Sequence, residues 1–131
     1  DIQTLGAAGG WIGSATDLLK FMLAIDGLNI PQDILSQESI DKMVTPRKVY
    51  LDPFGWRGVR SHSWYRTGTL AGTSALMVRR DDGISYVVLF NSSTWKGPML
   101  SSDIRRMMNR ALQKTDSWPA SSLFALASPW T

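Results

Sequence analysis

Residues 74–90 read SALMVRRDDGISYVVLF, and this stretch decides the fold class. Two runs suited to strands, Ser74–Arg80 and Ile84–Phe90, flank the turn-forming triplet Asp81-Asp82-Gly83. An Asp-Gly pair between two such runs is a strong hairpin signal, because glycine tolerates the positive φ that tight turns need. The stretch therefore predicts two antiparallel strands. Its second run is apolar almost throughout, which predicts a central strand buried on both faces.

Further β-type runs precede this hairpin. Residues 54–59 (FGWRGV) form one of them, and Ser63-Trp64-Tyr65 begins another. Aromatic and β-branched side chains of this kind favour extended structure. We therefore expect the antiparallel sheet to continue upstream of Ser74.

Two helices are predicted before the strands. Ser14 or Thr16 caps the first, which covers about residues 15–26 and stops at Gly27. Ser36 caps the second, which ends at Thr45-Pro46 because proline disfavours helical structure in the residue before it. Apolar residues recur at helical spacing in both segments: Leu18, Leu19, Phe21, Met22 and Ile25 in the first, Ile40 and Met43 in the second.

A last helix follows the strands, with Pro98 in its first turn. Its apolar stripe comprises Leu100, Ile104, Met107, Met108, Ala111 and Leu112. The predicted order is helix, helix, three antiparallel strands, helix, which is an α+β architecture with helices flanking the sheet. We expect residues 1–116 to form this domain and residues 117–131 to form an irregular tail.

Composition excludes several classes of function. The 131 residues include no cysteine and one histidine, which excludes disulfides, thiol nucleophiles and multi-histidine metal sites. We therefore expect no metal and no cofactor. No apolar run reaches the ~18 residues that a membrane span needs. The net charge of +3 is mild, and the pairs Arg79-Arg80 and Arg105-Arg106 are flanked by acids or lie on a helix face, so nucleic-acid binding is not expected.

The segment Arg66–Thr73 (RTGTLAGT) contains the strongest candidate site residues. Arg66 can hold a carboxylate in two parallel hydrogen bonds, Thr67 adds a hydroxyl donor, and Gly68 admits a ligand close to the backbone. These residues predict an anion-binding element at a strand edge. The alternative is a glycine-rich connection that carries an exposed arginine.

Several motifs resemble the serine β-lactamase and penicillin-binding-protein superfamily, in particular its class C β-lactamase and esterase branch. They are Ala8-Gly9-Gly10 followed by Ser14-x-x-Asp17-Leu18-x-x-Phe21, the Ser36–Pro46 helix, Phe54-Gly55-Trp56, and Arg66-Thr67-Gly68 with Gly72 and the following hairpin. The last triplet is similar to the family's Lys-Thr-Gly or His-x-Gly element. The resemblance covers residues 8 to about 112 and implies the C-terminal portion of the β-lactamase-like (DD-peptidase) fold.

The resemblance also implies roles for the triplet. Arg66 takes the cation position and Thr67 the hydroxyl position, so both would orient a substrate carboxylate or assist proton transfer. Thr69 would offer its backbone N–H to an oxyanion hole. Arginine stays protonated and is poorly suited to shuttling protons. Its presence at position 66 therefore shifts the expectation from β-lactam hydrolysis towards an esterase, a peptidase or a degenerate activity on a small acyl or peptide-like substrate.

The family's nucleophile, a serine three residues before a lysine, is not expected in this chain. Ser39-x-x-Lys42 lies inside a helix that the family uses structurally, and Ser93-x-x-Lys96 follows the triplet and is broken by Gly97-Pro98. No Tyr-x-Asn or Ser-x-Asn motif is present. His62 is expected on a loop rather than in a catalytic triad.

We therefore predict the C-terminal segment of a serine hydrolase that is inactive by itself. The chain begins at Asp1 without an initiator methionine or a leader, as expected of a processed product or a piece of a longer protein. Its partner would be the missing N-terminal part, and the apolar surface left exposed would favour self-association.

The alternative is a non-catalytic binding module that uses exposed tryptophans and an unpaired sheet edge. Trp11, Trp56, Trp64 and Trp95 either line such a ligand cleft or pack in the core and against a partner domain.

Overall fold

The computed structural model describes residues 1–45, 53–60, 63–95 and 99–121. The chain divides into two compact units, residues 1–101 and residues 102–131. The first unit contains α1 (Ile2–Leu5), the 3₁₀ helix η1 (Gly6–Ala8), α2 (Ala15–Leu23), α3 (Gln37–Val44) and the strands β1 (Gly58–Arg60), β2 (Ser63–Leu70), β3 (Thr73–Arg79) and β4 (Ser85–Phe90). Helix α4 (Met99–Gln113) begins at the end of the first unit and forms most of the described part of the second unit. The α+β fold class is confirmed.

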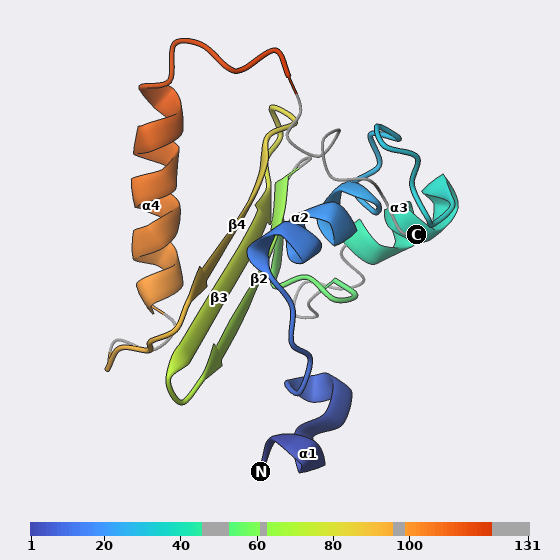
Figure 1. Cartoon of the computed structure of the whole chain (residues 1–131). Helices are drawn as coiled ribbons and strands as arrows, with labels where there is room; N and C mark the ends of the chain where they lie inside the picture. The colour runs from blue at the N-terminus through green and yellow to red at the C-terminus, as the bar shows by residue number, and fades with distance from the viewer. Residues whose placement is uncertain (46–52, 61–62, 96–98, 122–131) are drawn as a thin grey trace. The chain divides into compact units, whose positions relative to one another are not determined.

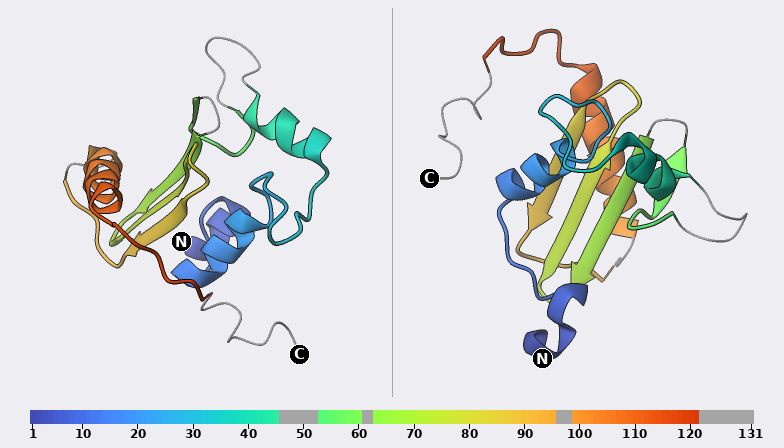
Figure 2. Two further views of the ribbon diagram at one scale, coloured as in Figure 1. Left: turned by 90° about the horizontal axis from the view of Figure 1, so that it is seen from above. Right: turned by 90° about the vertical axis from the view of Figure 1, so that its right-hand side faces the viewer.

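The four strands form one antiparallel sheet in the order β1-β2-β3-β4 (Figure 1). Ala71 and Gly72 connect β2 to β3 in a tight turn. Gly72 has a φ of +79°, a backbone conformation that residues with a side chain rarely adopt. Helix α2 lies across one face of the sheet, over β3 and β4 (Figure 2). This face is called the α2 face below, and it carries the buried cluster that includes Met22 and Trp64.

The core of the first unit forms between α2 and the start of β2. Its buried side chains are Met22, Ile25, Trp56 and Trp64. The two indole rings are 6.0 Å apart between centroids and tilted by 55°. Partly buried hydrophobic residues complete the cluster: Met43, Val44, Val59 and Met77. Two of the four tryptophans singled out in the sequence thus pack in the core, whereas Trp11 and Trp95 are 83% and 93% exposed.

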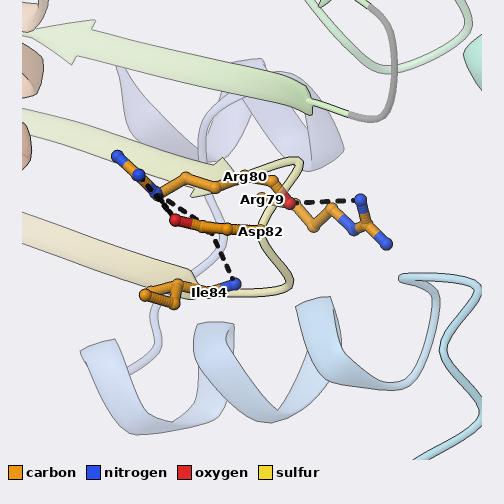
Figure 3. Close-up of polar contacts among 4 residues, drawn as sticks. All are labelled: Arg79, Arg80, Asp82 and Ile84. Atoms are coloured by element: carbon orange, nitrogen blue, oxygen red, sulfur yellow. Dashed lines mark hydrogen bonds and ion pairs between the residues drawn. The ribbon is translucent and has the colours of Figure 1, made fainter.

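The β3–β4 hairpin is confirmed, and polar contacts close its turn (Figure 3). Arg80 Nε lies 3.0 Å from both carboxylate oxygens of Asp82, and Nη2 donates to Oδ2 at 2.6 Å. The Ile84 N–H donates to Oδ1 of the same carboxylate at 3.2 Å. The side-chain hydrogen bonds between the two residues raise the pKa of Arg80 and lower the pKa of Asp82.

The neighbouring Arg79 is buried, and its guanidinium lies 4.6 Å from the centroid of the Trp64 ring. Its Nη1 also donates to the Arg80 carbonyl at 3.1 Å (Figure 3). The arginine pair 79–80 therefore has structural contacts within the hairpin and the core.

The helix starts follow the predicted caps. Ser14 Oγ accepts the Asp17 N–H at 3.1 Å, while Asp17 Oδ2 accepts the Ser14 N–H at 3.0 Å, which forms a capping box. Ser36 Oγ accepts the Ser39 N–H at 3.3 Å. The second helix ends before Thr45 as expected, although Pro46 lies outside the described residues. The last helix is also confirmed; Pro98 lies outside the described residues.

Helix α2 ends at Leu23, three residues before the predicted end. The last turn tightens there, because the Ala24 N–H contacts the Phe21 carbonyl at 3.2 Å and the Ile25 N–H donates to the Met22 carbonyl at 3.2 Å, three residues back rather than four. Beyond this end, Asp26 Oδ1 accepts the Leu28 N–H at 2.9 Å. Asp26 is completely buried, and burial raises its pKa.

The strand predictions need two corrections. Only Gly58 and Val59 of the run 54–59 lie in a strand, β1, because Phe54 and Gly55 lie in a turn where Gly55 has a φ of +78°. Ile84–Phe90 was predicted to be a central strand buried on both faces, but among the described residues β4 is an edge strand, and only Tyr86 in it is buried. Its apolar residues thus lie at the edge of the described sheet rather than in its middle. Residues 117–121 of the predicted tail form neither helix nor strand.

Candidate functional site

The predicted site residues lie inside a strand. Arg66, Thr67, Gly68 and Thr69 are all in β2, paired with Met77, Leu76, Ala75 and Ser74 of β3. These four residues therefore belong to a strand and not to a connection, and the turn is confined to Ala71 and Gly72. Arg66 is exposed, as the alternative also expects. The hydroxyl-bearing and glycine positions weakened the strand pattern in the sequence, but the ladder with β3 overrides that local preference.

Alternation along β2 distributes the four residues over the two faces of the sheet. Trp64 is buried in the core on the α2 face, so Arg66 and Gly68 lie on that same face. Thr67 and Thr69 lie on the opposite face. Arg66 and Thr69 are exposed, and Thr67 is partly buried.

The backbone of β2 has an open edge from residue 66 onward, within the described part of the chain. Strand β1 pairs only with Ser63, Trp64 and Tyr65. The Tyr65 carbonyl accepts the Arg57 N–H at 2.9 Å, so odd-numbered residues of β2 direct their backbone groups towards the β1 side. The N–H and C=O groups of Thr67 and Thr69 thus point to the open edge, away from β3.

Arg57 is a candidate site residue that sequence reasoning missed. Its Nη1 donates to Thr67 Oγ1 at 3.3 Å, and its side chain is exposed. The sequence places Arg57 ten residues from Thr67, and only the β1–β2 register brings the two together. The cation that contacts the Thr67 hydroxyl is therefore Arg57, while Arg66 lies on the α2 face.

An open groove of about 680 Å³ adjoins β2 on the α2 face. Its apolar lining comes from the segment before α2, from α2 itself and from the three strands β2–β4, and includes Trp11, Ile12, Leu18, Phe21, Leu70, Ala75 and Leu89. Gly68 and Thr69 also line it, so the groove meets the predicted site along β2. The charged lining residue is Asp17, whose hydrogen bonds with Ser14 hold its pKa below the usual value. Asp17 is thus a capping carboxylate that remains ionised, and it is unsuited to proton transfer at neutral pH.

The two serine–lysine pairs show no catalytic geometry among the described residues. Lys42 Nζ pairs with Glu38 Oε1 at 2.6 Å, whereas the Ser39 hydroxyl lies 3.0 Å from that of Ser36. Ser93 Oγ accepts the Gly72 N–H at 3.2 Å, and its lysine, residue 96, lies outside the described residues. His62 lies outside them as well.

The described residues show few features of a metal site, a membrane span or a nucleic-acid interface. No group of three or more potential metal ligands occurs among the described residues. Of the helices that the structure describes, none has the length and apolar character to cross a membrane. Arg106 pairs with Asp103 one turn away on α4.

The comparison with protein-family models agrees with the fold. No match was found among curated proteins or among solved structures. The family model described as Beta-lactamase matches residues 2–107, from α1 well into α4, and so takes in β2, its open edge and the groove. Because this match covers most of the chain, the protein belongs to the Beta-lactamase family.

Proposed function

We propose that this chain is the C-terminal segment of a β-lactamase-related serine hydrolase that acts by acyl transfer on a small ester or peptide-like substrate. Residues Arg66–Thr69 form one wall of its active site, and the nucleophilic serine and its base come from an N-terminal part of the same protein. The chain alone is catalytically inactive.

The observation that carries this proposal is the open edge of β2 in a chain of this family. The Thr69 N–H points away from β3 at the open edge of β2, where no described strand pairs with it. A carbonyl placed there would receive a hydrogen bond that strengthens as negative charge develops on its oxygen. The serine oxygen adds to the carbonyl carbon, the leaving group departs with a proton, and water then hydrolyses the acyl-serine.

Charge supports the same placement. Arg57 and Arg66 both lie at this part of β2, and both side chains are exposed. Because a guanidinium group can hold a carboxylate in two parallel hydrogen bonds, these residues would attract and orient an anionic substrate group. The proton transfers belong to the base that accompanies the nucleophile.

The test uses the longer natural protein that contains this chain. Thr69→Pro removes the proposed oxyanion donor at an edge position where proline is tolerated, since no described ladder bond uses that N–H. Thr69→Ala is the matched control, because it removes the hydroxyl and keeps the N–H. We expect Thr69→Pro to lower the rate of acylation by p-nitrophenyl acetate about 10²- to 10³-fold, and Thr69→Ala to change it only a few-fold.

Two results would contradict the proposal. One is equal acylation of the Thr69→Pro protein and the unmodified protein, both shown to be folded. The other is esterase activity of the 131-residue chain alone that disappears on Ser39→Ala or Ser93→Ala, which would place the nucleophile inside this chain. Absence of any acyl-serine in the longer protein would favour the non-catalytic binding module.

A further inference from the structure

The apolar groove beside β2 has a structural cause in the sheet. On the α2 face, Gly68 lies opposite Ala75, and a Cβ added at Gly68 would lie 3.5 Å from the Ala75 Cβ. Two of the smallest residues thus face each other in the lining of the groove. This pair is called the floor of the groove below.

The walls of the groove are large apolar side chains that remain open to solvent. Trp11 is 83% exposed, Phe21 51%, and Leu70 38%. Contiguous apolar surface of this kind is uncommon on soluble proteins unless it binds something. The volume of about 680 Å³ is within the range of pockets that hold small molecules.

The groove is continuous with the proposed active-site wall. Gly68 and Thr69 line both, and Arg66 lies on the same face, two residues along β2 from Gly68. A ligand in the groove would therefore have its apolar part over the Gly68–Ala75 floor and a polar end near Arg66. This arrangement suits a molecule with an apolar chain and a carboxyl or ester end.

We propose that the groove binds the apolar acyl chain of the substrate, so that the enzyme prefers medium-length acyl groups over acetyl groups. This inference rests on the proposed function for the identity of the ligand, but binding to the groove requires no nucleophile. The occupant is an acyl chain because the groove opens onto the residues that would hold its carbonyl end.

The first experiment measures binding of octanoate and acetate to the 131-residue chain by calorimetry, with chemical shifts of the Gly68 and Thr69 amides recorded in parallel. We expect one octanoate per chain, bound at least about tenfold more tightly than acetate, because each buried methylene contributes ~0.8 kcal/mol. Equal affinity for the two anions, or octanoate binding that leaves both amide shifts unchanged, would overturn the inference.

Matched variants locate the binding. Ala75→Leu fills the floor, and Trp11→Ala removes a wall that lies outside the helices and strands. Both are expected to weaken octanoate binding at least about tenfold, since they block or remove apolar contacts. Ala111→Leu and Trp95→Ala, at exposed positions outside the groove, should leave binding unchanged. Unchanged binding in the folded Trp11→Ala protein would contradict the inference.

The remaining outcomes separate this inference from the proposed function. A groove that is blocked by concentration-dependent dimerisation would make a second copy its occupant and overturn the inference. If the longer protein acylates equally fast with p-nitrophenyl octanoate and acetate, the groove inference is wrong while the hydrolase proposal survives. If octanoate binds as expected but no acyl-serine forms, the groove binds apolar acids and the hydrolase proposal fails.

Discussion

Trp64 connects the core to the strand that carries the candidate site, and its replacement by alanine is the most informative stability test. The side chain is 4% exposed and packs against Trp56 and Ile25. Truncating a buried tryptophan costs about 3–5 kcal/mol in free energy of unfolding. A domain of this size has about 5–15 kcal/mol in total, so Trp64→Ala should remove a large share of it.

The cation above the ring adds a second, separable contribution. The Arg79 guanidinium lies 4.6 Å from the Trp64 centroid, and a desolvated pair of this kind contributes about 0.5–2 kcal/mol. A double-mutant cycle with Trp64→Leu and Arg79→Met isolates this coupling from the other contacts of each residue. We expect a coupling free energy in that range.

Urea denaturation followed by circular dichroism measures the free energy of unfolding lost in Trp64→Ala and the coupling free energy between Trp64 and Arg79. Trp95→Ala is the control, because Trp95 is 93% exposed and its truncation should change the free energy of unfolding by less than about 0.5 kcal/mol. A Trp64→Ala protein destabilised by no more than the control would refute the packing described for the core. A coupling near zero would refute the cation–π contribution alone.

Three further predictions concern the hairpins and a buried carboxylate. A Cβ at Gly58 would overlap the ring of Tyr65, so Gly58→Val should destabilise the fold by about 1–3 kcal/mol in thermal or urea unfolding, and an unchanged midpoint would contradict this contact. Asp82 has a lowered pKa in the folded protein because it accepts hydrogen bonds from Arg80, so its stabilising contribution is present above its unfolded pKa of about 3.9 and is lost as pH falls through the folded value. Asp82→Asn should therefore cost up to about 1 kcal/mol at pH 7 and less below pH 3, and a cost that does not vary with pH would argue against the ion pair. Asp26 has a raised pKa because it is buried, so its contribution is greatest below the unfolded value and is lost as pH rises through the folded one; the stability of the unmodified protein relative to Asp26→Asn should fall over that interval, whereas parallel pH profiles would exclude the effect.

Local signals in the sequence were sufficient for most of the fold. Ser14 and Ser36 cap their helices as predicted, since a cap depends only on residues three positions away. The turn at residues 81–83 was equally readable, because its Asp-Gly pair sets the backbone geometry without help from the rest of the chain.

The sequence-based predictions are wrong or incomplete where contacts between residues far apart in the chain determine the structure. Nothing local shows that Arg66–Leu70 pair with β3 along their whole length, because glycine and threonine are also turn residues. Arg57 escaped notice for a related reason, since its contact with Thr67 exists only through the β1–β2 register. The edge position of β4 was missed because apolar content reflects burial by the whole protein, while strand order depends on which segments pair.

The open edge of β2 has a consequence for solubility. An unpaired strand edge can pair with the same edge of another copy, which is a common route to aggregation. Here, the exposed side chains of Arg57 and Arg66 lie at this stretch, so two copies approaching edge to edge would bring like charges together. In the proposed function, the same charges attract an anionic substrate group. Neutralising them to alter ligand preference would therefore also remove a barrier to aggregation, which couples the chemistry of the edge to the concentration at which the protein stays in solution.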